Sequence, residues 1–285
     1  MATSGDSRPV VVGVDARDSA RSAVVWAAEE AERRGVPLRL LHATSPGRHG
    51  AGDAGRRQTG RRPLDEASLL AADGRPGLEV TTVLADDSPG RALCHESHDA
   101  CLVVVGSRGL NRLEEFLSGN SVAVPVSAQA ACPVAVVLER GGPTDEPPYL
   151  VAGVDGSETS RAALRHAFED AAARDAEVRA LWVWQPSLLE AMDEVVVLQK
   201  CRRLLFDAVA EQAEAHPGVS ATRRVVRGHP VEELVKASEG ALAVVVGRRG
   251  RGGFTGMRLG SVPHGLLHHA HCPVVIVPTS PPARP

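Results

Sequence analysis

A loop near the C-terminus carries the residues of this chain that are best suited to bind an anion. Its glycines, arginines and serine are Gly247, Arg248, Arg249, Gly250, Arg251, Gly260 and Ser261. Glycines let backbone N–H groups come close to a phosphate, a serine hydroxyl can donate a hydrogen bond, and guanidinium groups add charge-assisted contacts. We therefore predict a phosphate-binding loop, and the alternative is that these glycines only make turns.

A strand and a helix must hold this loop in place. Residues 242–246 are wholly apolar, which is typical of a short strand buried on both faces. The loop then leads into a short helix that begins near Ser261, and residues 274–277 form a last apolar strand. A helix N-terminus presents unpaired N–H groups and the positive end of the helix dipole. The order of strand, glycine loop and helix start predicts an anion site.

The first half of the chain alternates short apolar stretches with helical segments. We predict strands over residues 10–14, 38–43, 78–84, 102–105 and 134–138. We predict helices over residues 19–34, 63–72 and 89–97. The stretch between residues 46 and 63 is rich in glycine and arginine and has no apolar period, so we expect a mobile surface loop there.

The pattern begins again after a polar stretch of glycines, prolines and acids. Asp15 and Asp155 end matching apolar runs 140 residues apart, and Cys132 and Cys272 stand before matching prolines at the same offset. This internal repeat predicts two similar domains, residues 1–140 and 149–285, joined by a linker over residues 141–148. The second half is expected to have strands and helices over residues 178–184, 187–215, 219–226 and 230–238.

Five strands that alternate with helices in each half predict a fold of the α/β class, with two doubly wound five-stranded parallel sheets. In such sheets a ligand binds beyond the carboxyl ends of the strands, where the strand order reverses. Asp155 follows the first strand of the second half and Gly247 follows the fourth, so we expect them to be neighbours. No Gly-x-Gly-x-x-Gly follows a first strand and no lysine follows a glycine loop, which argues against a nicotinamide site and a Walker loop.

The sequence resembles the universal stress protein family in its tandem two-domain form. Nucleotide-binding members of that family carry Gly, two residues, Gly, nine residues, Gly and then Ser or Thr, which Gly247, Gly250, Gly260 and Ser261 match without gaps. The resemblance implies a Rossmann-like, adenine-nucleotide-binding fold, with ATP as the ligand and Mg²⁺ as its potential companion. It implies that the ligand contacts Asp155 at the adenosine, Val183 at the adenine, and Val246, Gly247, Gly250, Gly260, Ser261 and Val262 along the ribose and phosphates.

The same resemblance implies a second nucleotide site in the first domain. Its residues would be Asp15, Ala43, Gly106, Gly109, Gly119 and Ser121. The first domain departs from the family pattern, because Asn120 stands where Ser or Thr is usual, and Ala16 and Arg17 replace Gly156 and Ser157. Losing a glycine restricts the approach of the backbone to a ligand. Acidic Glu114 and Glu115 would also repel phosphate, so we expect a weakened or altered site.

Composition argues against several classes of partner. The formal net charge is −3 and aromatic residues make up 3% of the chain, so neither a nucleic-acid footprint nor binding to an anionic membrane is indicated. No apolar run approaches the length of a membrane span, and the N-terminus does not resemble a signal peptide. The five scattered cysteines are best explained as reduced thiols in a cytoplasmic protein.

Several other motifs could have either a structural role or a role in metal binding or redox chemistry. His264, His268, His269 and His271 could hold zinc, although a polar helix face is the simpler explanation and we expect no metal site. Cys94 and Cys101 are better explained as buried thiols than as a redox pair. Asp86 and Asp87 are expected in a solvated turn and not around magnesium, and His229 is expected to cap a helix.

The leading functional hypothesis is an ATP-binding stress-response or regulatory protein that signals through nucleotide occupancy. It is not expected to be an efficient enzyme, since no general base, nucleophile or lysine lies at the phosphate loop, although slow ATP hydrolysis stays open. An enzyme that splits ATP between its α and β phosphates is a second hypothesis. The third is a nucleotide-free dimerising module. In the family the fifth strands pair, which implies a pseudo-dimer within this chain and would also allow a homodimer. The protein partner is unknown.

Overall fold

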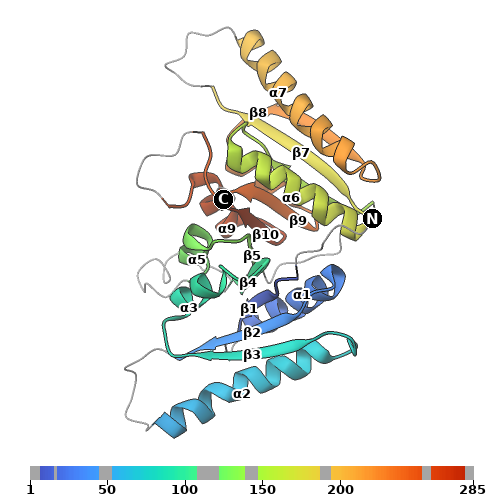
Figure 1. Cartoon of the computed structure of the whole chain (residues 1–285). Coiled ribbons are helices and arrows are strands. Elements are labelled where there is room, and N and C mark those ends of the chain that lie inside the picture. Colours follow the sequence, from blue (N-terminus) through green and yellow to red (C-terminus); the bar gives the residue numbers. More distant parts are fainter. Residues whose placement is uncertain are drawn as a thin grey trace, which may run out of the picture. The chain divides into compact units, whose positions relative to one another are not determined.

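The computed structural model describes residues 7–15, 18–44, 53–107, 122–138, 147–186, 194–251 and 258–279. The chain divides into two compact units, Met1–Glu139 and Arg140–Pro285 (Figure 1). The predicted linker lies mostly outside the described residues, as do the first-domain site residues Gly109, Gly119 and Ser121.

The first unit is a parallel sheet covered by helices on both faces. Its elements are β1 Val10–Gly13, α1 Asp18–Arg34, β2 Leu38–Ala43, α2 Asp53–Ala72, β3 Val80–Ala85, α3 Pro89–Glu96, β4 Leu102–Gly106, α5 Ala123–Gln129 and β5 Val134–Val137. The strand order is β3-β2-β1-β4-β5, and every one of these neighbouring pairs is parallel. Helices α1 and α2 pack together in one layer and α3 and α5 in the other.

The second unit repeats this arrangement. Its elements are β6 Tyr149–Gly153, α6 Glu158–Arg174, β7 Glu177–Trp184, α7 Glu194–Ala215, β8 Ala221–Arg227, α8 Pro230–Ala237, β9 Ala243–Gly247, α9 Ser261–His269 and β10 Val274–Val277. The strand order is β8-β7-β6-β9-β10, again parallel throughout. The predicted doubly wound α/β fold is therefore confirmed in both units, and the strand order of this sheet reverses between β6 and β9.

Local sequence explains where these elements begin and end. The β4 and β9 valines are buried because both faces of a central strand are covered. Helix α6 begins at Ser157, whose Oγ accepts a hydrogen bond from the Ser160 N–H, and ends at Asp175 with a left-handed backbone at φ 50°. Helix α1 ends at Gly35, where φ is 65°. Helix α6 packs on β6 and β9, and Thr159 in its first turn lies against Gly247 at the end of β9.

The loop predicted between residues 46 and 63 is wrong over its second part. Helix α2 begins at Asp53 and continues through Pro63. Its apolar face is formed late in the helix by Leu64, Ala67 and Ala71, which are buried while the helix packs on α1 and β2. Tertiary packing thus outweighs the weak helix propensity of a glycine- and arginine-rich sequence.

Helix α5 was not predicted from the sequence. It occupies the same place after β4 that α9 occupies after β9. Its buried side chains, Val126 and Ser127, are too few to give seven residues a clear helical period. The internal repeat was the available signal for this helix.

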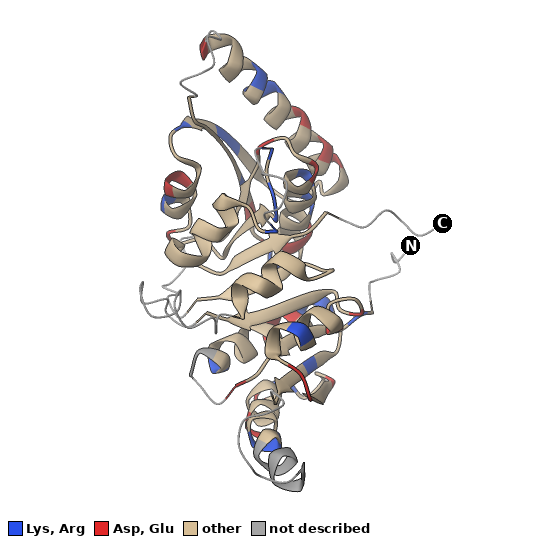
Figure 2. Ribbon diagram, turned by 90° about the vertical axis from the view of Figure 1, so that its left-hand side faces the viewer, with Lys and Arg blue, Asp and Glu red and all other residues tan. Residues whose placement is uncertain are grey.

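Charged residues of both signs are interspersed over the helices and strands of each unit (Figure 2). None of the helices in the described ranges is long and apolar enough to cross a membrane.

Candidate functional site

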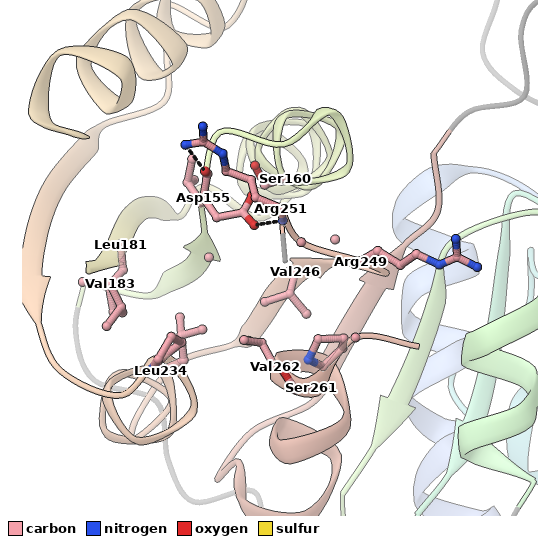
Figure 3. A pocket seen from close by; sticks show the side chains of 17 residues that line it. Asp155, Ser160, Leu181, Val183, Leu234, Val246, Arg249, Arg251, Ser261 and Val262 are labelled. Atoms are coloured by element: carbon pink, nitrogen blue, oxygen red, sulfur yellow. Dashed lines mark hydrogen bonds between the residues drawn. The ribbon is translucent and has the colours of Figure 1, made fainter. Parts of the chain in front are cut away.

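A cavity of about 260 Å³ lies at the carboxyl edge of the second sheet (Figure 3). It is bordered by the ends of β6, β7 and β9 and by the first turns of α8 and α9. All eight residues predicted for the second-domain site line it: Asp155, Val183, Val246, Gly247, Gly250, Gly260, Ser261 and Val262. Their contact with a ligand stays a prediction.

The inner wall of the cavity is apolar. Leu181 and Val183 come from the same face of β7, Leu234 from α8 and Val246 from β9, and Figure 3 shows these four side chains around one hollow. Sequence reasoning missed Leu181, although a residue two positions before Val183 must share its face of the strand. It also missed Leu234, whose contribution depends on how α8 lies against the sheet. The wall suits a flat apolar group of the size of a nucleobase.

Asp155 joins the two loops that border the cavity. Its Oδ1 accepts hydrogen bonds from the Ser157 N–H at 2.9 Å and the Ser157 hydroxyl at 2.6 Å. Its Oδ2 accepts a hydrogen bond from the Arg251 N–H at 2.9 Å. A carboxylate has about four lone-pair positions, so these three bonds leave room for one more donor, such as a ligand hydroxyl.

The glycines of the loop are needed for space. A Cβ on Gly250 would lie 2.5 Å from Asp155 Oδ2, and a Cβ on Gly247 would lie 2.8 Å from the backbone carbonyl carbon of Thr159. The Thr159 hydroxyl in turn donates a hydrogen bond to the Arg249 carbonyl, so this loop is fastened to the start of α6. The signature glycines therefore serve close packing of two backbone segments as well as any approach of a ligand.

The N-terminus of α9 meets the cavity. The Gly260 N–H donates to the Arg248 carbonyl at 2.9 Å, and the His264 N–H donates to the Gly260 carbonyl at 3.1 Å. The N–H groups of Ser261 and Val262 lie in the first turn, where a helix supplies no acceptor for them. With the exposed Ser261 hydroxyl beside them, these groups can bind an anion.

The arginines of the loop are arranged differently from one another. The Arg251 guanidinium lies by Asp155, with its Nη1 3.5 Å from the Asp155 carbonyl oxygen. Arg249 also borders the cavity, but its guanidinium points away from it in Figure 3, with Nε 3.5 Å from the Arg258 carbonyl oxygen. Phosphate contacts from the side chains of Arg248, Arg249 and Arg251 were predicted together, and this geometry favours Arg251 over Arg249.

The first unit carries its described site residues, Asp15, Ala43 and Gly106, at the ends of β1, β2 and β4. A cavity of about 310 Å³ on this unit lies by β2, β3 and α3 and is lined by none of those three residues. His42 occupies the position that Trp182 has in the second unit, and its Nδ1 lies 2.7 Å from the Val14 carbonyl oxygen. The weakened first site therefore stays a prediction.

The remaining motifs are mostly structural. All five cysteines are free, and Cys132 and Cys272 are buried as expected, with burial raising the pKa of each thiol to about 12. Cys94 is only half-buried, so the expected pair of buried thiols is wrong for that residue.

The polar motifs lie in turns and at helix ends. Asp87 accepts a hydrogen bond from the Ser88 N–H in a turn. His229 occupies the N-cap position of α8, but its side chain makes no capping hydrogen bond. Among the described residues, no group of three or more His, Cys, Asp or Glu side chains could hold a metal ion.

The chain is similar in sequence to known proteins over almost its whole length. The model of the universal stress protein family matches residues 7–137 and, again, residues 150–278. A universal stress protein of Mycobacterium tuberculosis strain H37Rv is 35% identical over 303 aligned positions, which cover 97% of this chain and 98% of that protein. One of Mycolicibacterium smegmatis is 34% identical over 97% of this chain and 99% of its own length.

The fold is shared with solved structures at lower identity. A universal stress protein from Archaeoglobus fulgidus has a TM-score of 0.72 to this chain, with 18% identity over 95% of this chain and 96% of that one. At that identity the likeness concerns the fold alone. The two family matches and the relatives of similar length lead to one conclusion: the chain belongs to the universal stress protein family and contains two copies of its domain.

Proposed function

We propose that the second unit binds an adenine nucleotide, ATP in the first place, and that the protein signals stress through the occupancy of this site. One observation carries the proposal: an apolar wall faces the same cavity as the N-terminus of α9, which no side chain of the described residues caps. Its volume, about 260 Å³, is slightly below the range of roughly 300–1,000 Å³ that is usual for ligand pockets. A cavity of this size suits the nucleoside while the phosphates extend along the loop.

The residues present fit each part of such a ligand. The adenine would lie between Leu181, Val183 and Leu234, where burial of apolar surface stabilises it. The ribose would approach Asp155, and the phosphates would receive hydrogen bonds from Ser261 and the first turn of α9. Asp155 is the one acidic residue in the part of the lining that the structure describes, so Mg²⁺ would be held mainly by the phosphates.

The same lining argues for a binding protein and against an efficient enzyme. Among the described residues that line the cavity there is no lysine, histidine or cysteine, and the carboxylate of Asp155 already accepts three hydrogen bonds. General-base and nucleophilic catalysis need such groups. Slow ATP hydrolysis is compatible with this proposal, whereas steady-state turnover at about 1 per second or faster is typical of enzymes and would contradict it.

Binding is tested by filling the apolar wall. Val183→Trp places a large ring in the cavity, so isothermal titration calorimetry with ATP should show the loss of binding. The matched control is Ala43→Trp, at the corresponding position of β2 in the first unit, which should leave the affinity unchanged. Equal loss in both variants, or no loss in either, would reject the site. Mass spectrometry of small molecules released from the purified protein tests which nucleotide is carried.

A nucleotide-free dimerising module is the alternative. It is favoured by the composition of β5 and β10, which consist only of valine, alanine and isoleucine. Pairing of these strands, as a pseudo-dimer or a homodimer, would protect apolar sheet edges. Light scattering with and without ATP tests the assembly, and a purified protein that carries no nucleotide and binds none would favour this alternative. We also propose a cytoplasmic location, because the five cysteines are free thiols.

A further inference from the structure

Two histidines on α9 lie outside the cavity and have no role in the proposed function. His264 and His268 are half-buried and four residues apart, so they lie on the same side of the helix. Their ring centroids are 4.9 Å apart, with an angle of 60° between the ring planes. We propose that His264 and His268 together bind a divalent transition-metal ion, such as Zn²⁺ or Cu²⁺.

The distance between the rings matches a shared metal ion. Zinc lies about 2.1 Å from an imidazole nitrogen, so its distance to the ring centre is about 3 Å. Two such rings at a near-tetrahedral angle around one ion have centres roughly 5 Å apart. The observed 4.9 Å between the ring centroids is close to this separation.

The imidazole nitrogens are available for coordination. Within the part of the chain that the structure describes, neither ring makes a hydrogen bond or an ion pair with another residue. His271, by contrast, has its Nε2 3.8 Å from Glu239 Oε1. Neutral imidazole is the commonest protein ligand for zinc and copper, so two adjacent rings without partners make a chelating pair.

The site would be a labile one. Since the described residues offer no third histidine, cysteine or carboxylate in a suitable group, water must complete the coordination. His269 follows His268 directly but its ring centroid is 6.2 Å away, on a different side of the helix. With two protein ligands, affinity should follow the intrinsic order of the metals, and Cu²⁺ should bind more tightly than Zn²⁺.

Metal binding would stabilise helix α9 around Gly265. Gly265 lies between the two histidines, and a Cβ there would come within 2.7 Å of the Val231 side chain on α8. Close packing thus requires a glycine in the middle of the helix, where it lowers helix stability. An ion that bridges His264 and His268 closes one turn across this glycine.

The test is titration of the nucleotide-free protein with Zn²⁺ alone, followed by calorimetry. One ion per chain is expected, and His264→Gln and His268→Gln should each weaken binding by at least about tenfold because each removes half of the protein ligands. His269→Gln, on the same helix, is the matched control and should retain the affinity. Equal weakening by His269→Gln, or unchanged binding in the first two variants, would overturn the proposal.

A second measurement needs no substitution and guards against misfolded variants. In the unaltered protein, substoichiometric Cu²⁺ should broaden the ring NMR signals of His264 and His268 before those of exposed His95 and His98 in the first unit. Simultaneous broadening of all four would show nonspecific binding and overturn the site. Because no nucleotide is present, neither outcome depends on the function proposed for the cavity.

Discussion

The two units have the same strand order and the same helical layers but differ at the edge where a ligand would bind. In the second unit Gly156 has φ at 81°, and a Cβ there would lie 2.9 Å from the Trp182 ring. The first unit has Ala16 and His42 at these positions. The strand order and the helical layers are thus the same in both copies, while the sequence after the first strand differs. The fold therefore does not require a glycine at this position, whereas the second unit needs one there to keep a positive φ beside the Trp182 ring.

The largest difference between the two units is expected when the second glycine of each loop is replaced. Gly250→Val should weaken ATP binding by about 100-fold, because the side chain displaces the Asp155 carboxylate and removes its bond to the Arg251 N–H, and hydrogen bonds to charged groups contribute about 1.5–3 kcal/mol. The corresponding Gly109→Val in the first unit should change the affinity by less than about twofold, since one strong site per chain is expected. Calorimetry gives the affinity and the stoichiometry together, and a stoichiometry of two ATP per chain would disprove the difference between the units.

The free energy of unfolding tests the same difference when Gly156 and Ala16 are each replaced by the residue of the other unit. Gly156→Ala should lower the free energy of unfolding by about 1–2 kcal/mol, because alanine is strained at positive φ and its Cβ meets Trp182. Ala16→Gly in the first unit should cost much less, since it introduces no clash. Urea denaturation measures both. Equal effects would mean that Gly156 has no special role.

Arg251 distinguishes the two loops by charge. The first unit has Leu110 at the corresponding place. Arg251→Leu should weaken ATP binding by roughly three- to tenfold, because it removes a guanidinium beside Asp155, and the loss should shrink at high salt. Arg249→Leu should have less than about a twofold effect, since that side chain points away from the cavity. If Arg249→Leu proves the more harmful of the two, the assigned geometry of the loop is incorrect.

Most of the second site could be predicted because its residues follow apolar strands at a repeated spacing. Gly247 ends β9 and Asp155 follows β6 by two residues. Because these strands flank the reversal of strand order, topology alone makes the two residues neighbours. Leu234 could not be predicted, because its place depends on the packing of α8 against the sheet. The first part of helix α2 was missed because its glycine- and arginine-rich sequence has no apolar period, whereas the predicted part, residues 63–72, contains the buried Leu64, Ala67 and Ala71.

The smallest difference between the units is expected at Cys132 and Cys272. Burial raises the pKa of both thiols to about 12 from 9.0, so folding favours the protonated form in both. The stability contributed by this shift is fully present below pH 9 and is lost as the pH rises towards 12. At pH 8 a thiol reagent should modify half-buried Cys94 first and should reach Cys132 and Cys272 only as the protein unfolds, at similar rates. Mass spectrometry of the labelled peptides measures this order. Early labelling of Cys272 alone would show that the second core opens more readily than the first, because local opening is the route by which a reagent reaches a buried thiol.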